Sequence, residues 1–334
     1  MISSSDTALP APGAATAPGA AAARPRRPRL QPWHWAPYVF VSPFFVLFAV
    51  FGVFPMLFSV WMSFHQWDPA EGLSAMHWVG IDNYTYTLHD GEFFKALWNT
   101  VWLAVVAALP QQLVALPLAF ALHTAFGRWR NAVAGAYFLP FITSSVAISL
   151  VFTTIFSRDF GAMNGLLDAL HSLPLVGGLF PARHVDWFNE SHVRWVVAIV
   201  VWWRYTGWIT VLYLAALQTV PRELYEAAKI DGAKAVQQFF HITIPMLKPM
   251  MFFTVSLNLI GGLQLFEEPF ILTGGTGGAS RAARTAAMHL YSTAFVDGDF
   301  GTASAVAWLL FLFIGVLAFV NGRVFARTGL KEGE

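Results

Sequence analysis

Long apolar stretches separated by polar segments recur over most of the chain. Six of them are long enough to cross a bilayer, because a hydrocarbon core of about 30 Å needs roughly 20 apolar residues in a helix. These stretches cover residues 38–64, 97–122, 132–156, 193–217, 249–272 and 302–325. The pattern predicts an all-α polytopic membrane protein with six transmembrane helices.

The two ends of the chain depart from this pattern. Residues 1–35 are rich in Ser, Ala, Pro and Gly and contain the basic run RPRRPR at 24–29. Such a composition buries too little apolar surface to fold. We therefore expect a disordered N-terminal tail over 1–35, a six-span domain over 36–327 and a short C-terminal tail over 328–334. A cleaved signal peptide is not expected, because the apolar run that follows the arginines is as long as a full span.

Composition excludes several other classes of protein. Hydrophobic residues make up 56% of the 334 positions and charged residues 12%, about half the charged fraction of a soluble domain. The net charge of +1 argues against a nucleic-acid partner. The absence of Cys excludes disulfide frameworks and thiolate chemistry. The ten histidines lack the spacing of metal ligands, so no metal site is expected.

Lys and Arg are distributed unequally among the segments that connect the spans. If the N-terminus is cytoplasmic, about twice as many of them fall in cytoplasmic as in outer segments, which is the bias that sets membrane orientation. Arg204 is the one basic residue near the middle of a span. Both termini are therefore expected on the cytoplasmic side.

The connection between the fourth and fifth spans, residues 218–248, is long and polar. Its pattern predicts a first short helix that begins near Pro221 and ends at Gly232, and a second over 234–241 that stops before Pro245. Helices this short are marginal alone in water. They must pack either on the ends of the protein's own spans or on another protein.

The residues of this connection resemble a known signature. In the permease subunits of binding-protein-dependent ABC importers, Glu-Ala-Ala is followed after three residues by Gly, and after nine more by Ile-x-Leu-Pro. The spacing matches here, with Ile in place of the Leu. The matching positions are Glu226, Ala227, Ala228, Gly232, Ile242, Ile244 and Pro245.

Three further segments look like the carbohydrate branch of these permeases, the branch of maltose, lactose and glycerol phosphate transport. They are residues 79–84 (VGIDNY), Asn99-Thr100 and residues 272–275 (LTGG). The chain lacks the two extra N-terminal spans of the maltose-type members, so it is similar to the shorter six-span form. The resemblance covers about residues 36–327 and implies the fold of a type I importer permease in the inner membrane of a bacterium.

The resemblance also implies a set of partners. A second homologous permease would complete the translocation pathway, an ATPase dimer would bind inside, and a solute-binding protein would deliver a sugar or oligosaccharide from outside. No phosphate-binding GxxxxGK[ST] run occurs in this chain. ATP and Mg²⁺ would therefore belong to the ATPase, and this subunit would carry no cofactor and no catalytic residue.

Within that assembly, the connection at 218–248 would form a helix that docks on the ATPase and couples hydrolysis to transport. We call residues 218–248 the coupling loop. Glu226 would contact the ATPase and Gly232 would make the turn that orients the helix. The expected coupling residues are Glu226, Ala227, Ala228, Asp231, Gly232 and Pro245.

Polar residues in the fourth and fifth spans are candidates for the substrate pathway, because polar groups in hydrocarbon normally face the protein or a water-filled path. The polar candidates are Arg204, Asn258, Gln264, Glu267 and Glu268, and Phe266 is added because an aromatic face suits the apolar side of a sugar ring. Arg204 is expected either to pair with Glu267 or Glu268, or to line a cavity alone. The two glutamates have the alternative of lying solvated at the outer interface.

The sequence leaves two questions open, which are the role of the aromatic residues near Arg204 and the class of substrate or transporter. The aromatic residues around Arg204, which are Trp202, Trp203, Tyr205 and Trp208, suit either stacking on a sugar or packing against lipid. The substrate is alternatively another polar solute, such as glycerol phosphate or a polyamine. A different class is an ion-coupled secondary transporter that uses Arg204 and the glutamates as a proton relay.

Overall fold

The structure is a computed structural model that describes residues 35–125, 127–174, 177–181 and 183–329. The predicted N-terminal tail lies outside the described residues except for Trp35. Of the predicted C-terminal tail, only 328–329 is described, as the end of a helix. The chain divides into two compact units, Met1–Met56 and Leu57–Glu334.

The first predicted span is a helix over Ala36–Met62. It consists of α1 (Ala36–Phe48), the π-helical segment η2 (Ala49–Val53) and α2 (Phe54–Met62). No residue of α1 or η2 is buried. The helix is long and apolar enough to cross a bilayer.

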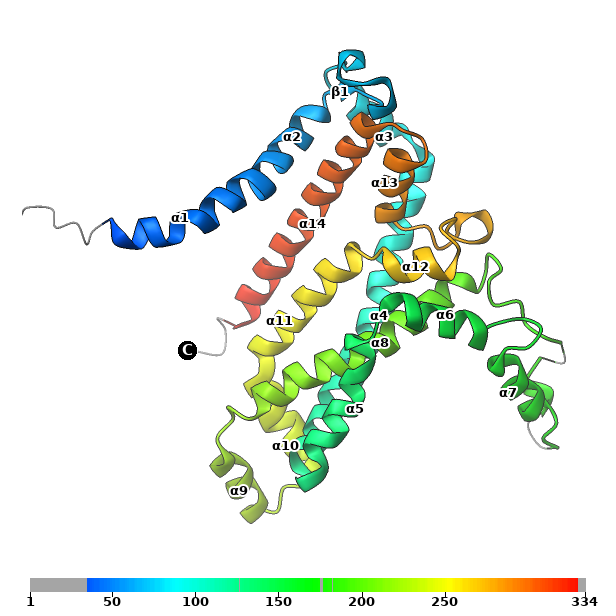
Figure 1. Cartoon of the computed structure of the whole chain (residues 1–334). Helices are drawn as coiled ribbons and strands as arrows, with labels where there is room; N and C mark the ends of the chain where they lie inside the picture. The colour runs from blue at the N-terminus through cyan, green and yellow to red at the C-terminus, as the bar shows by residue number, and fades with distance from the viewer. Residues whose placement is uncertain (1–34, 126, 175–176, 182, 330–334) are drawn as a thin grey trace, which may run out of the picture. The chain divides into compact units, whose positions relative to one another are not determined.

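The second unit holds the remaining spans and the segments that connect them (Figure 1). Its long helices are α4 (Gly91–Thr124), α8 (Val193–Leu217), α11 (Ile244–Leu263) and α14 (Phe300–Gly329). Its shorter helices are α3 (Asp82–His89), α5 (Arg130–Ile142), α6 (Ser145–Ile155), α7 (Ala162–His171), α9 (Arg222–Ile230), α10 (Ala235–Gln238), α12 (Glu267–Leu272) and α13 (Ala286–Phe295). Strands β1 (His65–Gln66) and β2 (His77–Trp78) form one antiparallel pair. Single-turn and π-helical segments are η3 (Pro69–Glu71), η4 (Leu73–Ala75), η5 (Gly127–Trp129), η6 (Gly177–Leu179), η7 (Phe239–Thr243) and η8 (Ala279–Arg281).

The third predicted span is broken rather than continuous. It comprises Gly127–Ile142 and Ser145–Ile155, which are bent by 92° at the break. Thr143 is extended (φ −77°, ψ 148°), and Pro140 precedes it within the last turn of α5. Because Pro has no backbone N–H to donate, that turn is weakened at the place where the chain leaves the helix. Among the described residues, five helices are long enough to span, and the bent pair makes a sixth.

The predicted bounds of the fifth span, residues 249–272, are wrong at both ends. The helix begins within the coupling loop at Ala235 and ends at Leu263, and α12 is a separate helix. The predicted stop before Pro245 does not occur, because the π-helical segment η7 widens the helix just ahead of it. A wider turn relieves the clash between a proline ring and the carbonyl four residues earlier.

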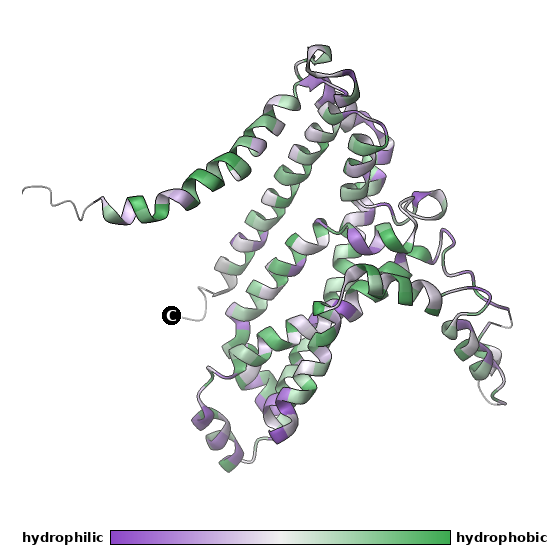
Figure 2. Ribbon diagram, viewed as in Figure 1, coloured by the Kyte–Doolittle hydropathy of each residue, from purple (hydrophilic) through white to green (hydrophobic). Residues whose placement is uncertain are grey.

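Helices α4 and α8 pack along much of their length and form the core of the second unit, with α5 and α11 against them. Small residues let the backbones approach closely, as is usual in membrane helix packing. A Cβ on Gly207 would lie 1.6 Å from the Tyr137 carbonyl oxygen, and one on Gly262 would lie 2.8 Å from the Ala104 Cβ. Apolar residues dominate these helices, whereas polar residues gather at the two ends of the unit (Figure 2).

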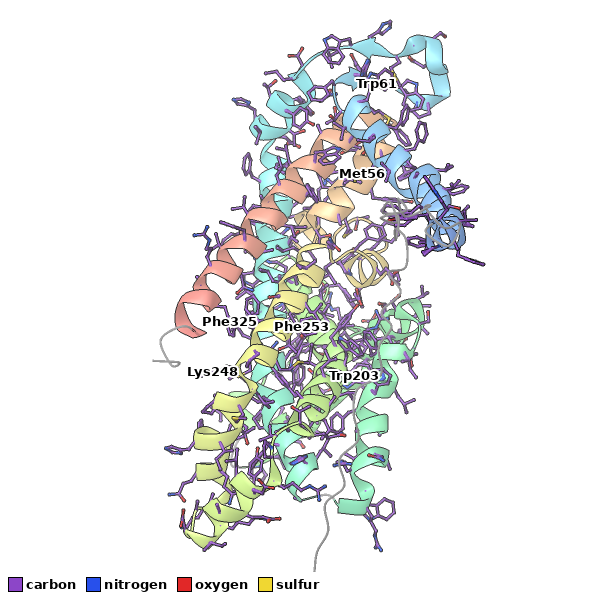
Figure 3. The ribbon with its side chains drawn as sticks, turned by 90° about the vertical axis from the view of Figure 1, so that its left-hand side faces the viewer. Met56, Trp61, Trp203, Lys248, Phe253 and Phe325 are labelled. Atoms are coloured by element: carbon purple, nitrogen blue, oxygen red, sulfur yellow. The ribbon has the colours of Figure 1, made fainter. Side chains whose placement is uncertain are left out.

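Helix α14 packs on α11 through its C-terminal half. The Phe252 and Phe325 rings stack with centroids 4.2 Å apart, and the Asn321 amide donates to the Ser256 hydroxyl at 2.9 Å. Lys248 and Phe325 lie near each other in the side-chain view (Figure 3). The contacts between α14 and α11 therefore lie part-way along the unit, between the level of α13 and that of α9 (Figure 1).

Candidate functional site

Helix α9 of the coupling loop lies at the end of the second unit opposite α3 and α13 (Figure 1). It begins after Pro221, which has the non-helical conformation of an N-cap (φ −58°, ψ 128°). Gly232 ends it with φ +80°, as the sequence predicted. The Gly232 and Ala233 amides donate to the carbonyls of Lys229 and Ala228 at 3.0 and 2.8 Å, which satisfies part of the helix end.

One buried residue fastens α9 to the rest of its own chain. Tyr225 is 7% exposed, and its hydroxyl lies 2.9 Å from the Thr243 hydroxyl. Glu226 and Ala227 are exposed, and so is Asp231. Packing against the protein's own spans therefore buries Tyr225. It leaves the predicted coupling residues Glu226, Ala227 and Asp231 exposed.

Apolar side chains are exposed on the same loop. They are Leu224 (42% exposed), Ile230 (87%), Val236 (67%) and Phe240 (58%). Pro245 is exposed as well, in the first turn of α11. Leu224 and Ile230 lie outside the candidate spans, on the polar helix α9, and exposed apolar residues there are typical of a surface that contacts another protein.

A buried ion pair joins α8 to α12. Arg204 donates to Glu268, and the two side chains are 11% and 3% exposed. The Tyr205 hydroxyl donates to the same carboxylate at 3.2 Å, and Arg204 also donates to the Thr143 carbonyl at 3.2 Å. The predicted pairing of Arg204 is thus with Glu268, and its alternatives, an arginine alone in a cavity and a solvated Glu268, are wrong.

The second glutamate has a different environment. Glu267 is exposed and accepts a hydrogen bond from the Ser145 hydroxyl. Ser145 begins α6, directly after the break of the third span. Of the two adjacent glutamates of α12, Glu268 therefore contacts α8 and Glu267 contacts α6. The breaks of the third and fifth predicted spans meet at this place.

The other candidates form no hydrogen bond with this ion pair among the described residues. Gln264 is exposed at the end of α11. Phe266 precedes α12 and stacks on Phe270 with centroids 4.9 Å apart. Asn258 lines a cavity of about 250 Å³ enclosed by α4, α5, α8 and α11. Its amide nitrogen is buried and has no hydrogen-bond partner among the described residues.

The walls of this cavity include residues that sequence reasoning missed or left open. Phe141 and Trp208 stack on each other at 4.7 Å with planes 10° apart, and Tyr205 lies beside them. Gln111 donates to the Val201 carbonyl at 3.3 Å from the opposite helix. Gln111 was detectable as a polar residue inside the second apolar stretch. Phe141 carried no signal, because its position depends on where α5 ends.

Two of the segments that resemble the carbohydrate branch hold connections between helices in place. The Asn99 amide donates to the carbonyls of Arg281 and Arg284 at 3.2 and 3.1 Å, and the Thr100 hydroxyl accepts from the Ala286 amide at 2.8 Å. Asn83 similarly donates to two carbonyls that precede it in the chain, at 2.9 Å each. These residues position loops and do not line the cavity around Asn258.

Comparison with known proteins decides the family. Residues 113–328 match the model of the binding-protein-dependent transport system inner membrane component. The chain belongs to this family. The protein is therefore a transporter permease subunit rather than an enzyme, and its helical spans are those of an inner-membrane component.

Curated relatives agree with this assignment over nearly the whole permease. A probable ABC transporter permease, YurN of Bacillus subtilis, is 35% identical, with 89% of this chain and 97% of YurN covered. The arabinooligosaccharides transport permease AraP of the same species is 33% identical, with 90% of each chain covered. The lactose transport permease LacF of Rhizobium radiobacter is 34% identical, with 85% of this permease and 92% of LacF covered.

A solved structure shares the fold of this permease. It is a chain of a bacterial alginate ABC transporter in complex with an alginate pentasaccharide-bound periplasmic protein. The TM-score is 0.75 at 21% identity, and the match covers 89% of this permease and 96% of that chain. The type I importer permease fold that the resemblance implied is therefore confirmed.

Proposed function

We propose that this permease is one half of the translocation pathway of an ATP-driven importer for a sugar or oligosaccharide. A second homologous permease supplies the other half, and a solute-binding protein delivers the sugar. The substrate class rests on relatives named for lactose and arabinooligosaccharide transport. The end that carries α9 faces the cytoplasm in this proposal, and both termini lie on that side.

The observation that carries the proposal is the exposed α9. It keeps the Glu-Ala-Ala-Gly spacing, ends in a left-handed glycine and is fastened to its own chain by Tyr225. We propose that an ATPase subunit covers this surface, with Glu226 and Asp231 at polar contacts and Ala227 and Ala228 allowing close approach. ATP and Mg²⁺ then reside in the ATPase, with no cofactor in this subunit. An ion-coupled carrier has no use for such a loop.

Reconstitution tests this function directly. The complete transporter in nanodiscs, with its partner permease, ATPase and solute-binding protein, is expected to hydrolyse ATP faster when the binding protein carries sugar. A matched complex without the binding protein gives the basal rate. Transport that follows a proton or sodium gradient and is indifferent to ATP would contradict the proposal.

The cavity around Asn258 is the place where we propose that the sugar contacts this subunit. Sugar hydroxyls need donors and acceptors, and the apolar face of a pyranose packs on aromatic rings. Asn258 offers a free amide donor, and the stacked pair of Phe141 and Trp208 offers an aromatic wall. Gln264, Phe266 and Glu267 would line the route toward the outer side.

An Asn258→Leu substitution is expected to raise the KM for sugar uptake about tenfold, because one buried donor to the ligand is lost and a hydrogen bond of this kind contributes about 1.5 kcal/mol. Basal ATPase activity should not change, since the site is remote from α9. Uptake of labelled sugar in proteoliposomes measures the effect. Asn131→Leu, the same change at an exposed residue of α5 that does not line the cavity, is the control and should leave KM unchanged. An unchanged KM in Asn258→Leu would remove this cavity from the sugar's path.

A further inference from the structure

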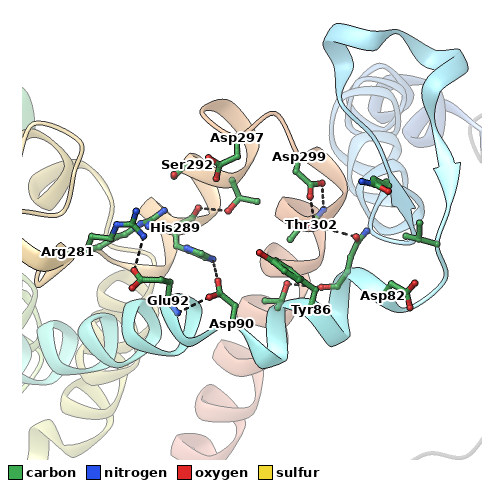
Figure 4. Close-up of a pocket in the computed structure, with 16 residues that line it drawn as sticks. Asp82, Tyr86, Asp90, Glu92, Arg281, His289, Ser292, Asp297, Asp299 and Thr302 are labelled. Carbon is green, nitrogen blue, oxygen red and sulfur yellow. Dashed lines mark hydrogen bonds and ion pairs between the residues drawn. The ribbon is translucent and has the colours of Figure 1, made fainter.

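Charged side chains line a pocket of about 610 Å³ between α3, α13 and the first turns of α4 and α14 (Figure 4). They pair within the chain, since Arg281 lies 3.0 Å from Glu92 and His289 lies 3.5 Å from Asp90. The cavity around Asn258 differs, because no charged residue is among the described side chains that line it. Its geometry therefore depends on hydrogen bonds between neutral groups and on packing.

Three neutral polar side chains meet beside this cavity, one from each of α4, α8 and α11. The Tyr213 hydroxyl of α8 donates to the Gln112 side-chain oxygen of α4, and it lies 2.7 Å from the Thr254 hydroxyl of α11. The Thr254 hydroxyl is also 3.3 Å from the same Gln112 oxygen and 3.0 Å from the Met251 carbonyl of its own helix. Tyr213 and Thr254 are both 0% exposed. We call Gln112, Tyr213 and Thr254 the three-helix junction.

The three-helix junction lies directly beyond the cavity on the side of the coupling loop. On α4 it adjoins the lining residue Gln111, on α8 it follows Trp208 and on α11 it precedes Leu257. Helix α8 ends and α11 begins on either side of the coupling loop, and the C-terminal end of α4 lies against α9. The junction therefore joins the same three helices that form most of the cavity wall.

Apolar side chains surround the junction on the side away from the cavity. Tyr213 belongs to a buried cluster that includes Leu116, Leu214, Leu217 and Leu247. A hydrogen bond in such surroundings is electrostatically stronger than one in water, and an unpaired group there is costly. The two hydroxyls are therefore held to partners from neighbouring helices.

The rotation of α11 about its own axis depends on few buried side chains. Leu247, Thr254 and Leu263 are the buried residues of this helix, and Gly262, which packs on α4, has no side chain to interlock there. Thr254 and Asn258 are four residues apart, so they lie on the same face of α11. A hydrogen bond at Thr254 therefore also sets the direction in which Asn258 points.

We propose that Tyr213 positions Asn258 for the sugar. By joining α4 to α11, its hydroxyl fixes the rotation of α11 that turns the Asn258 amide into the cavity. Tyr213 acts as a positioning residue, because it does not line the cavity itself. Phe141 and Trp208 differ in this respect, since their rings would contact the sugar directly. The proposal rests on the sugar site proposed above.

The test is sugar uptake by the complete transporter in proteoliposomes with Tyr213→Phe, which removes one oxygen and keeps the buried ring. The KM is expected to rise about fivefold, because the apparent affinity falls with the fraction of time that Asn258 points into the cavity. The kcat and the basal ATPase activity should stay near the wild type. Thr254→Val should give the same rise in KM, whereas Thr254→Ser, which keeps a hydroxyl, should retain the wild-type KM.

Two comparisons separate this positioning from a general loss of packing. In the double variant Tyr213→Phe/Thr254→Val, the KM should rise no further than in either single variant, because both changes break the same link. Tyr137→Phe is the matched control, since it is the same change at an exposed tyrosine of α5 that does not line the cavity. It should leave the KM unchanged. The thermal midpoint is recorded for every variant.

Three outcomes would overturn the positioning role. One is an unchanged KM in Tyr213→Phe while Asn258→Leu raises it. Another is a lower thermal midpoint and a lower kcat at unchanged KM, which makes the junction a structural support alone. The third is a double variant whose effects on KM add, which means that the two hydroxyls act separately. If Asn258→Leu itself leaves the KM unchanged, the proposed sugar site fails instead, and wild-type uptake that is indifferent to ATP would contradict the importer function.

Discussion

A Gly232→Val substitution is expected to abolish sugar uptake and its stimulation of ATP hydrolysis while the protein still folds and inserts. Gly232 has φ +80°, a conformation that costs a side-chain-bearing residue about 1–2 kcal/mol and a β-branched one more. A Cβ there meets nothing within 4 Å, so there is no clash with the core. The strain therefore acts on the end of α9 and changes its direction.

Loss of coupling has a signature that distinguishes it from loss of folding. Uptake by proteoliposomes should fall to background, whereas the yield of monodisperse protein and its thermal midpoint should stay near the wild type. Gly232→Asn is the first control, because Asn adopts left-handed conformations readily and should retain much of the uptake. Gly135→Val is the second, since Gly135 is exposed in α5 with open space and no positive φ. Full uptake by Gly232→Val would refute the role of this turn in coupling.

Hydrophobic patterning predicted the spans because the bilayer demands long apolar helices, whatever their neighbours. It did not predict the breaks at Thr143 and Gln264. A helix that contains Pro140 or the Gly261-Gly262 pair can continue through, as α4 does through its own two prolines. Whether it breaks depends on which groups elsewhere in the fold form hydrogen bonds with the backbone and side chains that the break leaves unpaired. At Thr143 that group is Arg204, from a helix distant in the sequence.

The left-handed Gly232 and the exposed helix before it were predictable because both follow from local spacing. The choice between Glu267 and Glu268 as the partner of Arg204 was not. In an uninterrupted fifth span the two glutamates would point about 100° apart, and either could face α8. The break after Leu263 resets that direction, and only the tertiary structure fixes it. The cavity around Asn258 could not be predicted from the sequence for the same reason, since it depends on which face each of four helices turns toward the others.

The second large effect is expected at the buried ion pair of Arg204 and Glu268. Arg204→Met leaves a carboxylate that is 3% exposed without its partner, and removing one member of a buried pair costs about 3–5 kcal/mol. The Thr143 carbonyl also loses a donor at the break of the third span. The variant should therefore show a much lower thermal midpoint and poor insertion. Glu268→Gln should lose less, because the amide oxygen can still accept from Arg204.

The double variant Arg204→Met/Glu268→Gln separates a structural pair from a proton relay. If the pair stabilises the two helix breaks, removing both charges should recover stability relative to Arg204→Met, since no buried charge remains. Part of the ATP-driven uptake should return with it. A double-mutant cycle on the thermal midpoint measures the coupling between the two sites. Glu267→Gln is the control, because this adjacent carboxylate is exposed and contacts Ser145 instead of Arg204. Additive losses of stability would contradict the pair. If the double variant recovers stability but uptake still requires a titratable Glu268, this carboxylate would instead be part of an ion-driven cycle. An ATP-driven permease needs the two broken spans held together, and it carries no proton between them.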